Sequence, residues 1–200
     1  YRDTEGKKEW HLLPWDKDGA WGIQGDAGSW WPHPLFGDQA HLKSNANQWS
    51  RLWDGLFNNA RTRAMYLRRL RTLMDEQLGT APGALEARVA AWWAPIAPHK
   101  SGVSTNGITN WLPTRRNQLF NTYSAPNSVI GTDEIPPVQA ADVALSFGQI
   151  DFNPSSGNQD EEFVEIVNAN NTAVDISGWV VAGGIAHTFK GGTVIPANES

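Results

Sequence analysis

The stretch WHLLPWDKDGAWG, residues 10–22, guides the interpretation of the first half of the chain. Its apolar first part predicts a strand, and two carboxylates, Asp16 and Asp18, follow that strand one residue apart. Carboxylates on a rigid strand end provide the oxygen ligands that Mg²⁺ and Mn²⁺ prefer. Paired acids at a strand end also close turns. The spacing alone therefore leaves metal binding and turn closure both open.

Composition limits the class of protein. The 200 residues can form one large domain or two small ones, and 40% apolar with 18% charged residues is typical of a globular chain. Eleven tryptophans, most of them before residue 54, indicate a rigid pocket or a tightly packed layer in the N-terminal part. The net charge of −5 argues against a nucleic-acid binder. The absence of cysteine excludes disulfide, thiolate-metal and cysteine-nucleophile chemistry.

The sequence shows no signal peptide and no apolar run near the ~18–20 residues that span a membrane. It begins at Tyr1 without a methionine, and it ends at Ser200 directly after an expected strand. We therefore expect a fragment of a longer protein.

Two kinds of sequence pattern follow one another along the chain. Residues 1–22 predict a hairpin, and the glycine- and proline-rich residues 22–48 predict an irregular loop, in which GIQGDAG (22–28) forms a flexible turn. Apolar residues at helical spacing then predict helices. They cover 47–59, 60–79, 82–96 and a last segment that begins near Pro113. Gly79 is the expected stop of the second helix, and Pro82 is expected in the first turn of the third. The third helix should turn five side chains inward: Leu85, Val89, Trp92, Trp93 and Ile96.

The C-terminal third has the pattern of a small β module. Residues 124–142 contain three prolines and no periodicity, and they predict a linker. From residue 143 onward, short β-type runs alternate with turn residues, and we expect Trp179 to be a core residue of a sandwich.

Two further groups of side chains are candidate sites. His33, Asp38 and His41 share one loop and could bind a metal, although their spacing matches no known zinc pattern. Five arginines crowd one predicted helix, and they predict either a solvated face balanced by Asp75 and Glu76, which we favour, or a surface for phosphate or an acidic substrate. They are Arg61, Arg63, Arg68, Arg69 and Arg71.

Residues 1–123 resemble the C-terminal portion of the spore-coat protein H (CotH) kinase family. The resemblance rests on WHLLPWDKDGAWG, on the aromatic loop after it, and on LFNNARTRAMYLRRLRTLMDEQLG. It implies an atypical protein-kinase-like fold and transfer of phosphate from ATP to Ser or Thr of a protein, with a divalent metal. Carried over to this sequence, Asp16 and Asp18 become the metal ligands for Mg²⁺ or Mn²⁺, and Asp16 is the first choice.

Two features depart from the family pattern. Lys17 places a cation between the two proposed ligands, although alternate strand residues point to opposite faces. The nucleotide-binding lobe and the catalytic aspartate of the family would precede Tyr1, so we expect the chain to contain no catalytic residue and to be inactive by itself.

Residues 143–200 resemble the first half of a lamin-tail domain, which implies an incomplete immunoglobulin-like β-sandwich. The motif EFVEIVN…VDISGW carries this resemblance. Bacterial secreted and surface proteins often combine the two families. Together they imply an α+β chain with a kinase-like module (1–123), a linker (124–142) and a truncated lamin-tail module (143–200).

Three functional hypotheses follow. The leading one is an extracellular or cell-surface bacterial protein kinase whose parent uses ATP, with a β module that binds or attaches to a surface or matrix ligand. The second is a non-catalytic adhesin or scaffold, in which the two aspartates close a turn or hold a structural Ca²⁺. The third is a nucleotide-sugar transferase that uses the same DxD pattern, but the helix-rich sequence after Asp18 fits poorly with a βαβ core.

Overall fold

The computed structural model describes residues 23–24, 28–29, 55–56, 58–79, 83–124 and 135–200. Strands β1 (Ile23–Gln24) and β2 (Gly28–Ser29) pair antiparallel. The GIQGDAG stretch therefore contributes a short strand pair within the region that we expected to be an irregular loop. The hairpin predicted over 1–22 and most of the helix predicted over 47–59, residues 47–54 and 57, lie outside the described residues.

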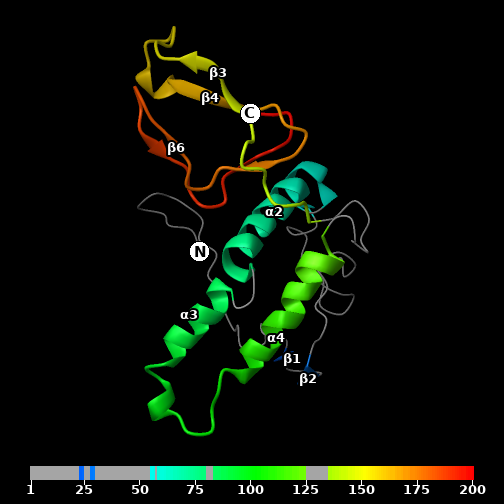
Figure 1. The fold of residues 1–200 in the computed structure, drawn as a ribbon. Helices are drawn as coiled ribbons and strands as arrows, with labels where there is room; N and C mark the ends of the chain where they lie inside the picture. The colour runs from blue at the N-terminus through cyan, green and yellow to red at the C-terminus, as the bar shows by residue number, and fades with distance from the viewer. Residues whose placement is uncertain (1–22, 25–27, 30–54, 57, 80–82, 125–134) are drawn as a thin grey trace.

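The described chain is α+β, as the sequence predicts, with helices first and small antiparallel sheets after them (Figure 1). Helix α2 lies between the β module on one side and helices α3 and α4 on the other (Figure 1). The helical elements are α2 (Ala60–Leu73), the π-helical turn η2 (Met74–Leu78), α3 (Ala84–Trp93), the 3₁₀ turn η3 (Ala97–His99), α4 (Asn106–Asn117) and the π-helical turn η4 (Gln118–Thr122).

Helix α2 forms where the sequence combines good helix formers with a start and a stop signal. Alanine, leucine, methionine and arginine dominate it. The side chain of Asn59 caps its N-terminus by accepting hydrogen bonds from the backbone N–H groups of Arg61 (2.9 Å) and Thr62 (3.3 Å). The helical path ends at Gly79, as predicted, where the backbone N–H donates to the Met74 carbonyl.

One face of α2 builds the core of the helical part. Leu67 and Met74 are buried against Leu119 and Tyr123 of the last helical turn. Ile135, which is fully buried, completes this core. Its backbone N–H donates to the Tyr123 carbonyl at 2.8 Å. Ile135 lies in the segment that we expected to be a linker, so this part of the segment is packed into the core.

Truncation of Ile135 is expected to destabilise the chain. Ile135→Ala removes a fully buried side chain from a packed cluster, and such changes cost about 2–5 kcal/mol of unfolding free energy. Val138→Ala, three positions further along the same segment, is the matched control because Val138 is 60% exposed. Urea unfolding of both variants measures the difference, and equal stability would contradict the packing described above.

Helices α3 and α4 differ in detail from the prediction. Helix α4 begins at Asn106, and Pro113 lies inside it, not near its start. A proline is favoured in the first turn of a helix, and this preference led to the wrong boundary. In α3, Val89 is buried as expected, whereas Trp92 is 62% exposed. The two helices are joined by an ion pair between Arg116 of α4 and Glu86 of α3.

The β module consists of paired antiparallel strands close to the predicted positions (Figure 1). Its core contains Val174, Ile176 and Ile195, with Leu145 and Phe189 packed against them. The pairs are β3 (Leu145–Asp151) with β4 (Phe163–Asn168), β5 (Val174–Asp175) with β8 (Val194–Ile195), and β6 (Val180–Val181) with β7 (His187–Thr188).

The tryptophan that we expected in the core of the β module lies at its surface. Trp179 is 42% exposed, so the expectation was wrong. It follows Gly178, whose φ of 77° lies in the left-handed region that favours glycine. This tight turn directs the chain from β5 into β6, and the smaller residues Val174 and Ile176 fill the core instead.

Strand β3 contains a bulge next to a glycine. The register with β4 shifts between Phe147 and Ile150. At the bulge, the Glu165 carboxylate folds back and accepts a hydrogen bond from the backbone N–H of Gln149 at 2.8 Å. A Cβ atom on Gly148 would overlap that carboxylate, so Gly148 permits the local geometry.

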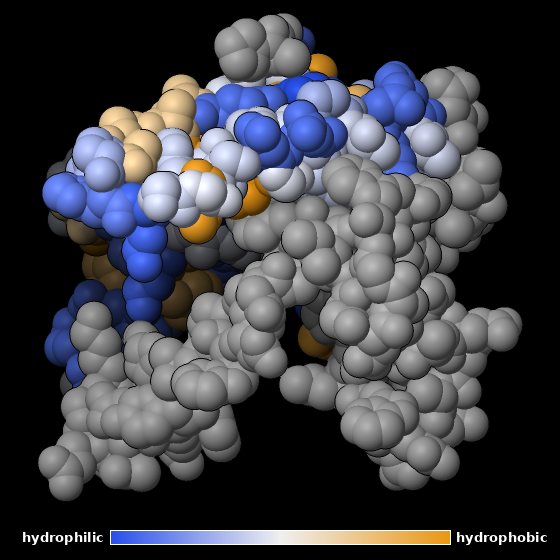
Figure 2. All heavy atoms as spheres, turned by 90° about the horizontal axis from the view of Figure 1, so that it is seen from below, coloured by the Kyte–Doolittle hydropathy of each residue, from blue (hydrophilic) through white to orange (hydrophobic). Residues whose placement is uncertain are grey.

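The described surface is of mixed polarity. On the face seen in Figure 2, the described residues are mostly hydrophilic or intermediate, and the strongly apolar ones form small separate areas. In the part of the chain that the structure describes, no helix is both long enough and apolar enough to cross a membrane.

Candidate functional site

The metal ligands predicted from the sequence, Asp16 and Asp18, lie outside the described residues, as do His33, Asp38 and His41. Among the residues that the structure describes, no group of three or more His, Asp or Glu side chains could hold a metal ion. An extensive polar site in the described chain is formed by the arginines of α2 where they meet the β module.

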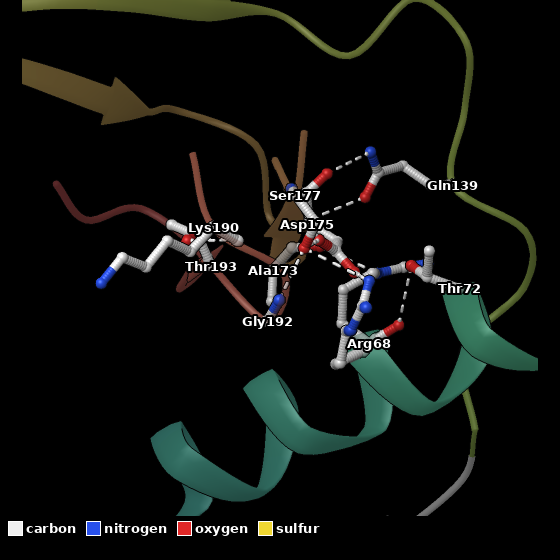
Figure 3. Close-up of polar contacts among 10 residues, drawn as sticks. Arg68, Thr72, Gln139, Ala173, Asp175, Ser177, Lys190, Gly192 and Thr193 are labelled. Carbon is white, nitrogen blue, oxygen red and sulfur yellow. Dashed lines mark hydrogen bonds and ion pairs between the residues drawn. The ribbon is translucent and has the colours of Figure 1, made fainter. Parts of the chain in front are cut away.

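Arg68 is at the centre of this site (Figure 3). It extends from α2 toward β5 and is only 4% exposed. Its Nε donates to the Ala173 carbonyl at 3.0 Å, and its Nη1 donates to the Pro137 carbonyl at 2.9 Å. A buried guanidinium is disfavoured unless its donors are satisfied, and here backbone carbonyls of the later segment accept two of them.

The arginines next to Arg68 reach other parts of the same segment. Arg69 Nη1 forms an ion pair with the Asp175 carboxylate at 3.1 Å. Arg71 Nη1 donates to the Pro136 carbonyl at 3.2 Å, while its Nε binds Asp75 one helical turn later. Three arginines of one helix thus contact residues within 136–177.

The Asp175 carboxylate connects these contacts to β5. Its side chain is 2% exposed, and it accepts hydrogen bonds from the Ser177 N–H (2.9 Å) and hydroxyl (2.5 Å) in addition to Arg69. The backbone of Asp175 is paired on its other side with the Gln139 side chain, through bonds of 2.8 and 3.0 Å (Figure 3). Gln139 therefore extends β5 as a neighbouring strand residue would.

The interpretation of these arginines as a solvated face was wrong for Arg68, which is buried, and incomplete for Arg69 and Arg71. The partners are carbonyl groups and one aspartate far along the chain, and no local pattern reveals them. The signal that the sequence did offer for this site was that arginines outnumber acidic residues on this short stretch of helix.

Burial and neighbouring charges shift two pKa values at the site. Burial is the main cause of the lowered pKa of Arg68, and repulsion from Arg71 adds to it, while Asp175 opposes the shift. For Asp175, burial acts to raise the pKa, but hydrogen bonds from Ser177, Thr72 and Arg69 together outweigh it and the pKa is lowered. Asp175 is therefore held as a carboxylate.

The lowered pKa of Asp175 predicts an acid-sensitive contribution to stability. A group whose pKa is lowered on folding stabilises the folded state above its unfolded pKa, here about 3.8. That contribution is lost as the pH falls from this value through the lower folded pKa. We expect wild type to be more stable than Asp175→Asn at pH 7, and the difference to shrink below pH 4. Urea unfolding of both proteins, at pH 7 and below pH 4, measures this difference in stability. A difference that does not change with pH would contradict the lowered pKa of Asp175.

Comparison with known families assigns both parts of the chain. The model for the Lamin Tail Domain matches residues 138–200, which include the β module. The model described as CotH kinase protein matches residues 1–106, more than half of the chain. The chain belongs to the CotH kinase protein family. Both resemblances inferred from the sequence are confirmed.

The CotH match includes WHLLPWDKDGAWG and the whole of helix α2. The arginine site therefore joins the CotH kinase region to the Lamin Tail Domain region of the same chain. No curated protein and no solved structure is significantly similar to the chain.

Proposed function

We propose that the parent of this chain is a protein kinase that transfers phosphate from ATP to Ser or Thr hydroxyls of a protein substrate. The observation that supports this most is the CotH kinase match over residues 1–106, because it includes the PWDKD stretch (14–18) with both aspartates. The proposal also places the protein outside the bacterial cell or at its surface.

In this proposal, Asp16 and Asp18 hold a Mg²⁺ or Mn²⁺ ion. When bound, the metal supplies positive charge that offsets the charge on the phosphates of ATP, and phosphoryl transfer depends chiefly on positioning and on such charge. The two aspartates provide anionic oxygen ligands on one short stretch of chain. We further propose that the parent supplies the phosphate-contacting lysine and the catalytic aspartate that the family resemblance implies.

A transfer assay tests the proposal. The intact parent is incubated with γ-labelled ATP and a general protein substrate, with Mg²⁺, with Mn²⁺, and with a chelator. We expect label on Ser and Thr only when a divalent metal is present. A folded parent that transfers no phosphate with either metal, to the general substrate or to itself, would overturn the proposal.

One observation supports a second role, in binding. An open apolar hollow of about 640 Å³ lies on the Lamin Tail Domain region, between the β3–β4 hairpin and β7. Phe152 (79% exposed) and Phe163 (45%) line it, together with the acidic residues Asp151 and Glu162. This surface suits a binding or attachment module, which we propose to have an immunoglobulin-like fold. The same surface would serve a non-catalytic scaffold or adhesin.

A further inference from the structure

We propose that the Lamin Tail Domain region is a fixed part of the helical lobe, held against α2 by its arginines, and not a module that swings on a linker. The interaction surface consists of Arg61, Arg68, Arg69 and Arg71 of α2. Its partner is the segment 136–199 of the same chain. The inference does not depend on kinase activity.

The contacts are spread along the helix. Near the N-terminal end of α2, Arg61 Nε forms an ion pair with the Glu199 carboxylate at 2.5 Å. Near the C-terminal end, Arg71 donates to the Pro136 carbonyl. These arginines are ten positions apart, which corresponds to about 15 Å along a helix. The contacts with residues 136–199 therefore extend along most of α2, and the exposed Arg61–Glu199 pair is expected to contribute least to them.

The central contacts are buried. If they opened, the buried polar groups would lose their hydrogen-bond and ion-pair partners. If the β module moved away, the guanidinium of Arg68 would lose the Ala173 carbonyl, and Arg69 would lose the carboxylate of Asp175. The Asp175 side chain is 2% exposed and would lose its only arginine partner among the described contacts. Buried polar groups are strongly disfavoured without their partners. The closed arrangement is therefore favoured over partly open ones.

The described part of the connection, residues 135–139, is also held at both of its ends. Ile135 is fully buried in the helical core, and Gln139 is bonded to the backbone of β5. Between them lie residues 136–138, of which Pro136 and Pro137 have a fixed φ. Both proline carbonyls accept hydrogen bonds from α2 arginines. The described part of the connection thus has little freedom to act as a hinge.

A distance measurement between two spin labels tests the proposal. The chain contains no cysteine, so Glu76→Cys in η2 and Gln149→Cys in β3 provide two exposed and unique labelling sites. Electron–electron double resonance on the full 200-residue chain reports the distribution of distances between them. We expect one narrow distribution. A broad or multiple distribution in the otherwise unchanged chain would overturn the proposal.

Variants of the arginines sharpen this test. Arg68→Ala in the doubly labelled chain is expected to broaden the distribution at least twofold. Arg61→Ala is the matched control, because Arg61 and Glu199 are both substantially exposed, and it should leave the width unchanged. If a folded Arg68→Ala chain still gave a narrow distribution of distances, Arg68 would have no role in positioning the β module. If this variant does not fold, the distribution of the chain with Arg68 intact still decides the proposal.

Discussion

The substitution Asp16→Ala is expected to abolish phosphoryl transfer by the intact parent protein. The proposed metal would lose a carboxylate ligand, and the charge on the phosphates of ATP would no longer be offset at the reacting position. Loss of an electrostatic contact of this kind lowers kcat by about 100-fold or more. The measurement is the rate of label transfer from γ-labelled ATP at saturating Mn²⁺.

The control is another aspartate of the same region. Asp54→Ala changes a residue outside the PWDKD stretch (14–18) and is expected to leave the rate close to that of wild type, because Asp54 is not one of the proposed metal ligands. Circular dichroism verifies that both variants are folded. Full activity in a folded Asp16→Ala parent would contradict the role proposed for this residue.

The substitution Arg68→Met is expected to be the most destabilising change at the arginine site. Methionine retains most of the apolar stem, so the loss falls on the two hydrogen bonds to the Ala173 and Pro137 carbonyls. Hydrogen bonds to charged groups contribute about 1.5–3 kcal/mol each, and the carbonyls would be left without these donors. We expect a decrease of about 3 kcal/mol or more in the free energy of unfolding, measured by urea titration.

Arg61→Met gives the corresponding control at the exposed edge of the same interface. The Arg61 and Glu199 side chains are 50% and 41% exposed, and exposed ion pairs contribute about 0–1 kcal/mol. A decrease of less than about 1 kcal/mol is therefore expected. If Arg68→Met and Arg61→Met were equally stable, the buried contacts of Arg68 would not have the importance inferred here.

The sequence predicted the features that depend on local signals. The apolar spacing predicted the helix over 60–79, whose buried side chains include Leu67 of α2 and Met74 of η2, and Gly79 marked the end of the helical path. The β-type runs after residue 143 located the strands of the β module to within a few residues. Each of these features is determined by residues close together in the sequence, such as a helical repeat or a cap.

Features that depend on distant partners were not predicted. Arg68 is buried because carbonyls more than sixty positions away accept its hydrogen bonds, and Ile135 is buried because the end of the connection returns to Tyr123. Neither partner has a signature in the surrounding residues. The same limit applies to Trp179, whose exposure is set by the turn at Gly178 and by which residues fill the module's core.

The candidate metal site came from the sequence alone. Asp16 and Asp18 were recognised by their position after an apolar stretch of sequence and by the family resemblance, and the CotH match includes both. Their role in metal binding stays a prediction. The arginine site, by contrast, came from the structure, and its described contacts join the CotH kinase region to the Lamin Tail Domain region.

Titration of ATP into the intact parent protein, with and without Mn²⁺, tests the proposed function most directly. Calorimetry measures the heat of binding in each case. A metal-dependent kinase is expected to show one saturable ATP site when Mn²⁺ is present, with binding much weaker when it is absent and when Asp16 and Asp18 are both replaced by alanine. No ATP binding by the folded parent, with or without the metal, would contradict the proposal and leave a scaffold or adhesin as the function.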